Sequence, residues 1–233
     1  MRKGKSWIWF YCLTIAAVLW AADWGSRAVT VVAENTPIAR SHCIIIDAGH
    51  GGEDGGAVSC TGIAESQYNL DISLRLNDLF HFLGYETKMI RTTDTAIYIS
   101  GKTLSQKKIS DLKERVRIAN ETEHAIYLSI HQNNFTDSQY SGAQVFYPSE
   151  GFSRDLASRL QENFRACLNP ESHRTIKKSK GVYLMEHIQC PGVLVECGFL
   201  SNPQEEAMLR DPEYQKKLCS IIAASISSCL MET

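Results

Sequence analysis

Short, continuously apolar runs are the feature that most constrains how this chain can fold. The runs at residues 43–47, 125–130 and 193–196 leave no polar face for water, so we expect strands that are covered on both sides. Shorter strands are expected at residues 85–90, 142–147 and 181–185. Buried strands of this kind are typical of a sheet with helices on both faces.

Stretches with helical spacing alternate with these runs, at residues 64–82, 111–121, 152–168, 205–209 and 212–230. Residues 96–108 are expected to form a loop. The alternation predicts an α/β fold, a single-domain three-layer sandwich with a mostly parallel central sheet flanked by helices.

The N-terminus has the pattern of an export segment. Arg2, Lys3 and Lys5 precede an apolar run at residues 7–22. As a helix this run spans about 24 Å, short of a hydrocarbon core of roughly 30 Å, which favours a cleaved signal peptide but leaves an uncleaved anchor open. We therefore expect a signal peptide or membrane anchor at residues 1–28, a linker at 29–41, and a catalytic domain at 42–233 outside the cytoplasmic membrane.

Charge and cysteine content argue against two other kinds of protein. The net charge is -2 and the body of the chain has no run of Lys or Arg, so nucleic acid is not an expected partner. The eight cysteines include no C-x-x-C pair and no zinc-ribbon spacing. We interpret them as small apolar core residues and expect no disulfide framework in a domain of this size.

Two histidines and a glutamate stand where three of the apolar runs end: His50, His131 and Glu196. The carboxyl ends of parallel strands meet at one edge of a sheet, so these side chains are expected to converge. Two imidazoles and a carboxylate are a suitable set of zinc ligands that leaves a fourth position for water. A carboxylate at the end of a buried strand also requires a metal, a cation or a proton as its partner.

Other carboxylates compete for the role of metal ligand. Glu53 follows His50 with the H-x-x-E spacing that zinc carboxypeptidases use, but it lies in a flexible glycine loop. Glu65 opens a predicted helix, where packing would hold it rigidly. Periodicity does not decide between the two.

A series of motifs resembles the zinc-dependent N-acetylmuramoyl-L-alanine amidases, specifically the catalytic domain of amidase family 3. The motifs follow in order from about Cys43 to Leu230: residues 47–52 (DAGHGG), 53–57 (EDGGA), 91–94 (RTTD), 129–133 (SIHQN) and 193–202 (VLVECGFLSN). The resemblance implies that His50, Glu65 and His131 bind Zn²⁺, and so favours Glu65 over Glu53. It implies that Glu196 is the catalytic acid and base, and that the bond cut joins the lactyl group of N-acetylmuramic acid to L-alanine in peptidoglycan.

Finer features resemble the germination-specific, spore-cortex subgroup, notably residues 129–135, 142–147 and 190–198. That resemblance implies action during sporulation in the intermembrane space of the forming spore, where stem peptides are removed on the way to muramic lactam. A deacetylase or a lipoprotein activator is then the expected partner, besides the membrane if the N-terminus is uncleaved. A vegetative cell-wall autolysin and a zinc carboxypeptidase acting on stem peptides remain the alternatives.

Some members of the family carry an inserted helix that blocks the zinc until an activator displaces it. Here only residues 135–141 lie between the SIHQN motif and the next expected strand, too few for such a helix. We expect no self-inhibition of that type.

Overall fold

The computed structural model describes residues 42–232 of the chain. The expected export segment at residues 1–28 and the linker at 29–41 lie outside the described residues. No helix among the described residues combines the length and the apolar character needed to cross a membrane.

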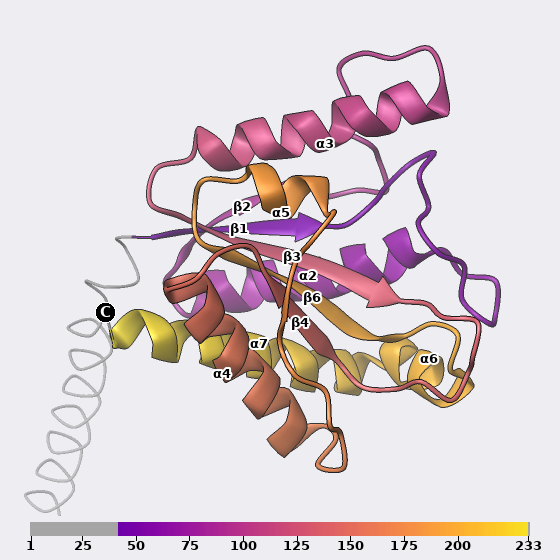
Figure 1. The fold of residues 1–233 in the computed structure, drawn as a ribbon, viewed down its shortest axis with the longest axis vertical. Coiled ribbons are helices and arrows are strands. Elements are labelled where there is room, and N and C mark those ends of the chain that lie inside the picture. The colour runs from indigo at the N-terminus through magenta and orange to yellow at the C-terminus, as the bar shows by residue number, and fades with distance from the viewer. Residues whose placement is uncertain (1–41, 233) are drawn as a thin grey trace, which may run out of the picture. The chain divides into compact units, whose positions relative to one another are not determined.

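A six-stranded sheet with the strand order β2-β1-β3-β6-β4-β5 forms the centre of the domain (Figure 1). Four strands run parallel to one another: β1 (Cys43–Ala48), β2 (Glu86–Met89), β3 (Ala125–Asn133) and β6 (Gly192–Phe199). β4 (Gln144–Tyr147) pairs antiparallel to β6, and β5 (Lys177–Lys178) pairs parallel to β4. The expected α/β class with a mostly parallel sheet is therefore confirmed.

Helices cover both faces of the sheet. α2 (Glu65–Phe82), α4 (Phe152–Cys167) and α7 (Pro212–Met231) pack on one face, and α3 (Leu104–Asn120) and α5 (Tyr183–His187) on the other (Figure 1). α6 (Pro203–Arg210) contacts β6 and α7. Side chains of β1 alternate between the two resulting cores, with Ile44 and Ile46 in the larger and Ile45 in the smaller. This double burial explains why the central strands read as continuous apolar runs.

Two local expectations were wrong, and one short strand was not expected. α3 begins at Leu104, inside the segment expected to be a loop, because Thr103 and Gln106 form a capping box that starts a helix whose first turns are polar. Residues 183–187 form the short helix α5, where a strand at residues 181–185 was expected, and Leu184 packs into the core under α3. The two-residue strand β5 was not expected at all.

The cysteine interpretation holds only in part. Among the described residues Cys43, Cys197, Cys219 and Cys229 are buried, as expected of core residues. Cys60 and Cys167 are exposed, contrary to that expectation, and Cys190 is half-buried. All seven described cysteines are free thiols.

Candidate metal centre and active site

The loop after β1 carries His50 in a backbone conformation that needs outside support. Its φ of 61° lies in the left-handed region, which is uncommon for a non-glycine residue. Two buried arginines supply that support. Arg115 of α3 donates from Nη2 to the His50 carbonyl at 2.8 Å, and Arg91 donates from Nη2 to the Gly49 carbonyl at 3.1 Å. Arg91 belongs to the RTTD motif, but only the fold shows that Arg91 and Arg115 together hold the loop that bears His50.

The charge of Arg115 is balanced by buried carboxylates. Its Nη1 pairs with Asp47 at the end of β1, and its Nε donates to Asp111 at 2.5 Å. Burial by itself would raise the pKa of Asp47, but the Arg115 guanidinium, together with His131 and the Ser129 hydroxyl, holds that pKa below its usual value. The ion pair therefore ties the end of β1 to α3.

Glu65 is the first residue of α2 and is 4% exposed. Its Oε1 accepts hydrogen bonds from the Gln132 backbone N–H at 3.1 Å and from the Asn69 amide at 3.3 Å, and its Oε2 accepts from the Ala57 N–H at 3.0 Å. A carboxylate also suits the positive end of a helix dipole. These bonds hold the carboxylate in one orientation.

The same carboxylate lies between the two histidines. His131 Nδ1 is 3.0 Å from Glu65 Oε1, and His50 Nε2 is 3.3 Å from Glu65 Oε2. The two imidazoles meet edge to face, with their centroids 5.0 Å apart. One potential ligand atom of each of the three residues lies within 4.8 Å of the others. The structure thus brings the three expected metal-binding side chains together.

Neighbouring glycines leave room for this arrangement. A Cβ on Gly49 would lie 2.2 Å from Nε2 of His131, and a Cβ on Gly56 would lie 2.6 Å from Oε2 of Glu65. Both distances are far inside van der Waals contact. The glycines of the loop therefore let the ligand side chains approach the backbone, and the donor set suits Zn²⁺, which prefers imidazole and carboxylate ligands.

The protonation of the cluster follows from its contacts. Burial would lower the pKa of His50, but its bonds to Asp54 and Glu65 raise that pKa to about 9. Burial would raise the pKa of Glu65, but the two histidines hold it far below its usual range. A cation binding between these groups therefore has to displace a proton from His50.

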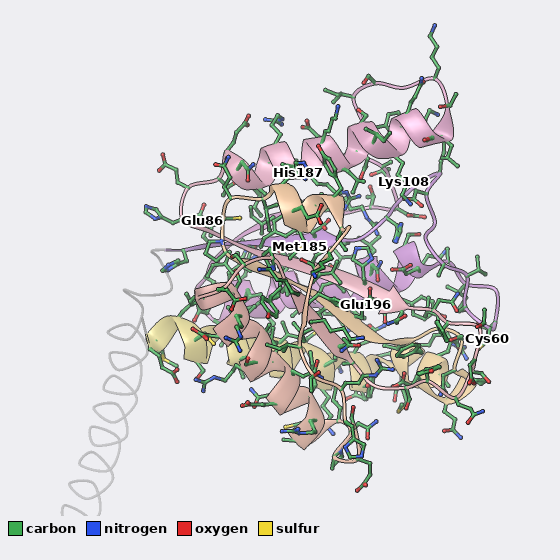
Figure 2. The ribbon with its side chains drawn as sticks, in the orientation of Figure 1. Cys60, Glu86, Lys108, Met185, His187 and Glu196 are labelled. Carbon is green, nitrogen blue, oxygen red and sulfur yellow. The ribbon has the colours of Figure 1, made fainter. Side chains whose placement is uncertain are left out.

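Glu196 lies beside this cluster on β6, in register with His131 of β3. Its Oε2 atom is buried and has no hydrogen-bond partner among the described residues. Burial raises the pKa of this carboxyl to about 7. A carboxyl that can gain and lose a proton near neutral pH suits acid–base chemistry on a group bound next to it. Figure 2 shows Glu196 toward the opposite end of the sheet from Glu86, the first residue of β2.

The strands extend further than the sequence pattern indicated. β3 continues through His131 to Asn133, and β6 continues through Glu196 to Phe199. His131, expected just after a strand, and Glu196, expected at the end of one, are therefore both held inside strands, and His50 lies on the loop after β1. Backbone pairing makes the placement of His131 and Glu196 more rigid than a loop would.

The rival carboxylate Glu53 points elsewhere. Its side chain is 55% exposed and pairs with Lys107 Nζ at 2.6 Å. Asp54, which the sequence did not single out, lies 3.1 Å from His50 Nδ1. The structure therefore separates Glu53 from the cluster and places Asp54 next to it.

The segment between β3 and β4 is a loop in the structure. Residues 134–143 contain turns and bends and no helix. Phe135 and Tyr140 lie on this segment, are about half exposed, and pack edge to face at 4.9 Å.

Comparison with known proteins places this geometry in a family context. The profile of the N-acetylmuramoyl-L-alanine amidase family matches residues 44–228, almost all of the described domain. The chain is 38% identical over 185 residues to the germination-specific N-acetylmuramoyl-L-alanine amidase of Bacillus subtilis, a match that covers 78% of this chain and 77% of that protein. It is 26% identical to the amidase AmiA of Escherichia coli, with 79% of this chain and 75% of AmiA covered.

Solved structures give the same result. The CwlD amidase of Clostridioides difficile, solved in complex with the GerS lipoprotein, superposes with a TM-score of 0.79 at 36% identity. That match covers 82% of this chain and 100% of the CwlD chain. An N-acetylmuramoyl-L-alanine amidase of Clostridium difficile 630 superposes with a TM-score of 0.69 at 28% identity, covering 81% of this chain and 96% of that one.

Proposed function

Since the chain belongs to the N-acetylmuramoyl-L-alanine amidase family, we propose that it is a zinc-dependent hydrolase of spore-cortex peptidoglycan. Membership of this family establishes that the chain is a peptidoglycan amidase. The proposal adds the metal, the residues that hold it, the acid–base residue and the form of peptidoglycan on which the enzyme acts.

The observation that carries the proposal is the meeting of His50, Glu65 and His131 beside an unpartnered Glu196 carboxyl oxygen. We assign the first three residues as the protein ligands of Zn²⁺. When bound there, the metal would polarise the scissile carbonyl and lower the pKa of the attacking water. The hydrogen bonds to Glu65 and the clamped loop around His50 keep these ligands in position, so binding needs little rearrangement.

Glu196 is the residue that we assign to proton transfer. As a carboxylate it takes a proton from the attacking water, and as a carboxylic acid it returns a proton to the departing amine of L-alanine. Its raised pKa keeps both forms accessible near neutral pH. Its place on β6, in register with His131 of β3, puts it beside the assigned metal ligands.

The cortex as substrate is supported by the resemblance to the germination-specific amidase of Bacillus subtilis and to CwlD. A lipoprotein partner is supported by the complex in which CwlD was solved. A deacetylase acting on the stripped muramic acid is the further functional partner that a pathway to muramic lactam requires.

Cell-wall substrates lie outside the cytoplasm, where amidases of this family act. We propose that residues 1–28 export the catalytic domain of residues 42–233, either as a cleaved signal or as an anchor. In a sporulating cell this places the enzyme in the space between the two spore membranes.

Digestion of two purified substrates tests the cortex assignment. Zinc-loaded protein is incubated with spore-cortex and with vegetative peptidoglycan, and the released stem peptides are quantified by mass spectrometry. Faster release from cortex supports the proposal, whereas equal or slower release supports a vegetative autolysin. Release of single amino acids would instead indicate the carboxypeptidase, for which the displaced Glu53 offers no ligand.

A further inference from the structure

Asp54 connects one of the assigned metal ligands to helix α3. Its Oδ2 atom accepts a hydrogen bond from His50 Nδ1 at 3.1 Å and an ion-paired hydrogen bond from Lys108 Nζ at 3.0 Å. The other oxygen, Oδ1, is 3.4 Å from the Gly56 backbone N–H. The carboxylate is thus held on two sides while it contacts the imidazole.

The two nitrogens of the His50 ring face different carboxylates. Nδ1 is directed at Asp54, and Nε2, on the far side of the ring, is 3.3 Å from Glu65 Oε2. A carboxylate can only accept a hydrogen bond, so Nδ1 must carry a proton. The lone pair of the neutral ring is then on Nε2, the nitrogen that points at the cluster.

Lys108 lies on the second turn of α3, and Figure 2 shows it toward the same end of the sheet as Glu196. Its partner Asp54 is 27% exposed and Lys108 itself is 49% exposed. An exposed ion pair adds little to stability. The location of this pair matters more than its strength, because one oxygen of Asp54 contacts both Lys108 and the assigned metal ligand His50.

The residues next to Asp54 and Lys108 form a comparable ion pair that does not contact His50. Glu53 and Lys107 form a second ion pair between the same loop and the same helix, at 2.6 Å. The bonds of Glu53 go to Lys107 and Tyr98, and none goes to the His50 ring. Two consecutive pairs therefore join the loop to α3, and one of them reaches the metal centre.

We propose that Asp54, anchored by Lys108, is a positioning residue that fixes the orientation of the His50 imidazole so that Nε2 is presented to Zn²⁺. This inference rests on the proposed zinc site. It assigns Asp54 no contact with substrate. It assigns α3, through Lys108, a part in setting how tightly the metal is held.

The test measures zinc affinity by competition with a chelator of known affinity, in purified protein carrying Asp54→Asn or Glu53→Gln. We expect Asp54→Asn to bind zinc about tenfold or more weakly, because loss of a carboxylate behind a ligating histidine has that order of effect. Glu53→Gln should stay within about twofold of wild type, since its side chain does not touch His50. Circular dichroism of the metal-free proteins checks that both variants are folded.

A second pair of variants tests the anchor. Lys108→Met should weaken zinc binding by several-fold, less than Asp54→Asn, and Lys107→Met should not. Nitrogen NMR of zinc-loaded wild type should show His50 protonated at Nδ1 and bound through Nε2. A purely structural role for Asp54 would lower thermal stability without changing zinc affinity or this pattern.

The outcomes are distinguishable. Equal affinity of Asp54→Asn and wild type, or equal losses in the Asp54 and Glu53 variants, would overturn the role of Asp54. Equal behaviour of the two lysine variants would overturn the role of Lys108. A folded wild-type protein that takes up no zinc would contradict the proposed metal site itself.

Discussion

Glu196 of β6 lies directly across from His131 of β3 in the register of two parallel strands. His131 is an assigned metal ligand and Glu196 is the assigned acid–base residue, so the pairing of β3 with β6 sets how far apart the two residues lie. The neighbouring apolar positions, such as Ile130 and Val195, are fully buried. The central strands therefore form the core and place the chemistry at the same time.

The buried carboxyl of Glu196 predicts an unusual dependence of stability on pH. Its pKa is raised from 4.5 to about 7, chiefly by burial. At a pH between these two pKa values, Glu196 has lost its proton in the unfolded chain but keeps it in the folded chain. A rise in pH over this range therefore lowers the free energy of unfolding. Metal-free wild type should lose stability relative to Glu196→Gln from about pH 5 to about pH 8, by on the order of 2 kcal/mol. Urea unfolding with a chelator present measures this difference, and a gap that does not change with pH would contradict it.

Substitution of Glu65 and of Glu53, the two candidate carboxylate ligands, should have different effects on zinc binding. Glu65→Gln removes the charge that lies between the histidines and should weaken zinc binding by at least about tenfold to a hundredfold, the loss seen when even a partner of a ligand is removed. Glu53→Gln removes a solvent-exposed charge and should leave zinc content unchanged. Metal analysis after dialysis against limiting zinc provides the measurement. Loss of zinc in the Glu53 variant with retention in the Glu65 variant would reverse the assignment.

Gly49 should tolerate no side chain. A Cβ at this position would lie 2.2 Å from the His131 ring, so Gly49→Ala should displace the imidazole and reduce zinc affinity by about tenfold or more. Gly55→Ala is the matched control in the same loop, because its nearest neighbour would be the Ala64 Cβ at 3.3 Å. Similar zinc affinities of the two alanine variants would show that the ring does not depend on this close approach.

The segment between β3 and β4 predicts that the enzyme needs no displacement of a blocking helix. Residues 134–143 contain none, so the zinc-loaded protein should release stem peptides without an added lipoprotein. A lipoprotein partner should then change the rate by a modest factor. Comparing rates with and without it is the measurement, and complete dependence on the partner would refute this expectation.

The sequence was most informative where burial and chemistry coincide. His50, His131 and Glu196 could be identified because each follows or interrupts an apolar run, and strand ends of a parallel sheet converge. The choice of Glu65 over Glu53 needed family resemblance, because local spacing favoured neither. In the structure Glu65 contacts both histidines, whereas Glu53 pairs with Lys107; the assignment of Glu65 as the ligand stays a prediction.

The contacts that support the site could not be predicted from sequence. Arg115 is 65 residues from the His50 carbonyl that it binds, and Lys108 meets Asp54 only because α3 packs over the loop after β1. Local pattern also failed for residues 183–187, where a short apolar stretch forms a helix because Leu184 packs beneath α3. In each case long-range packing, which leaves no periodic signal in the sequence, determined the result.

The central claim is tested most directly by digesting purified cortex peptidoglycan with zinc-loaded wild type and Glu196→Gln, and reading the fragments by mass spectrometry. Wild type should release intact stem peptides with a free L-alanine amino group. The variant should bind zinc normally but release them about a hundredfold to ten-thousandfold more slowly. Equal release by the two proteins, or release of single amino acids by wild type, would contradict the account.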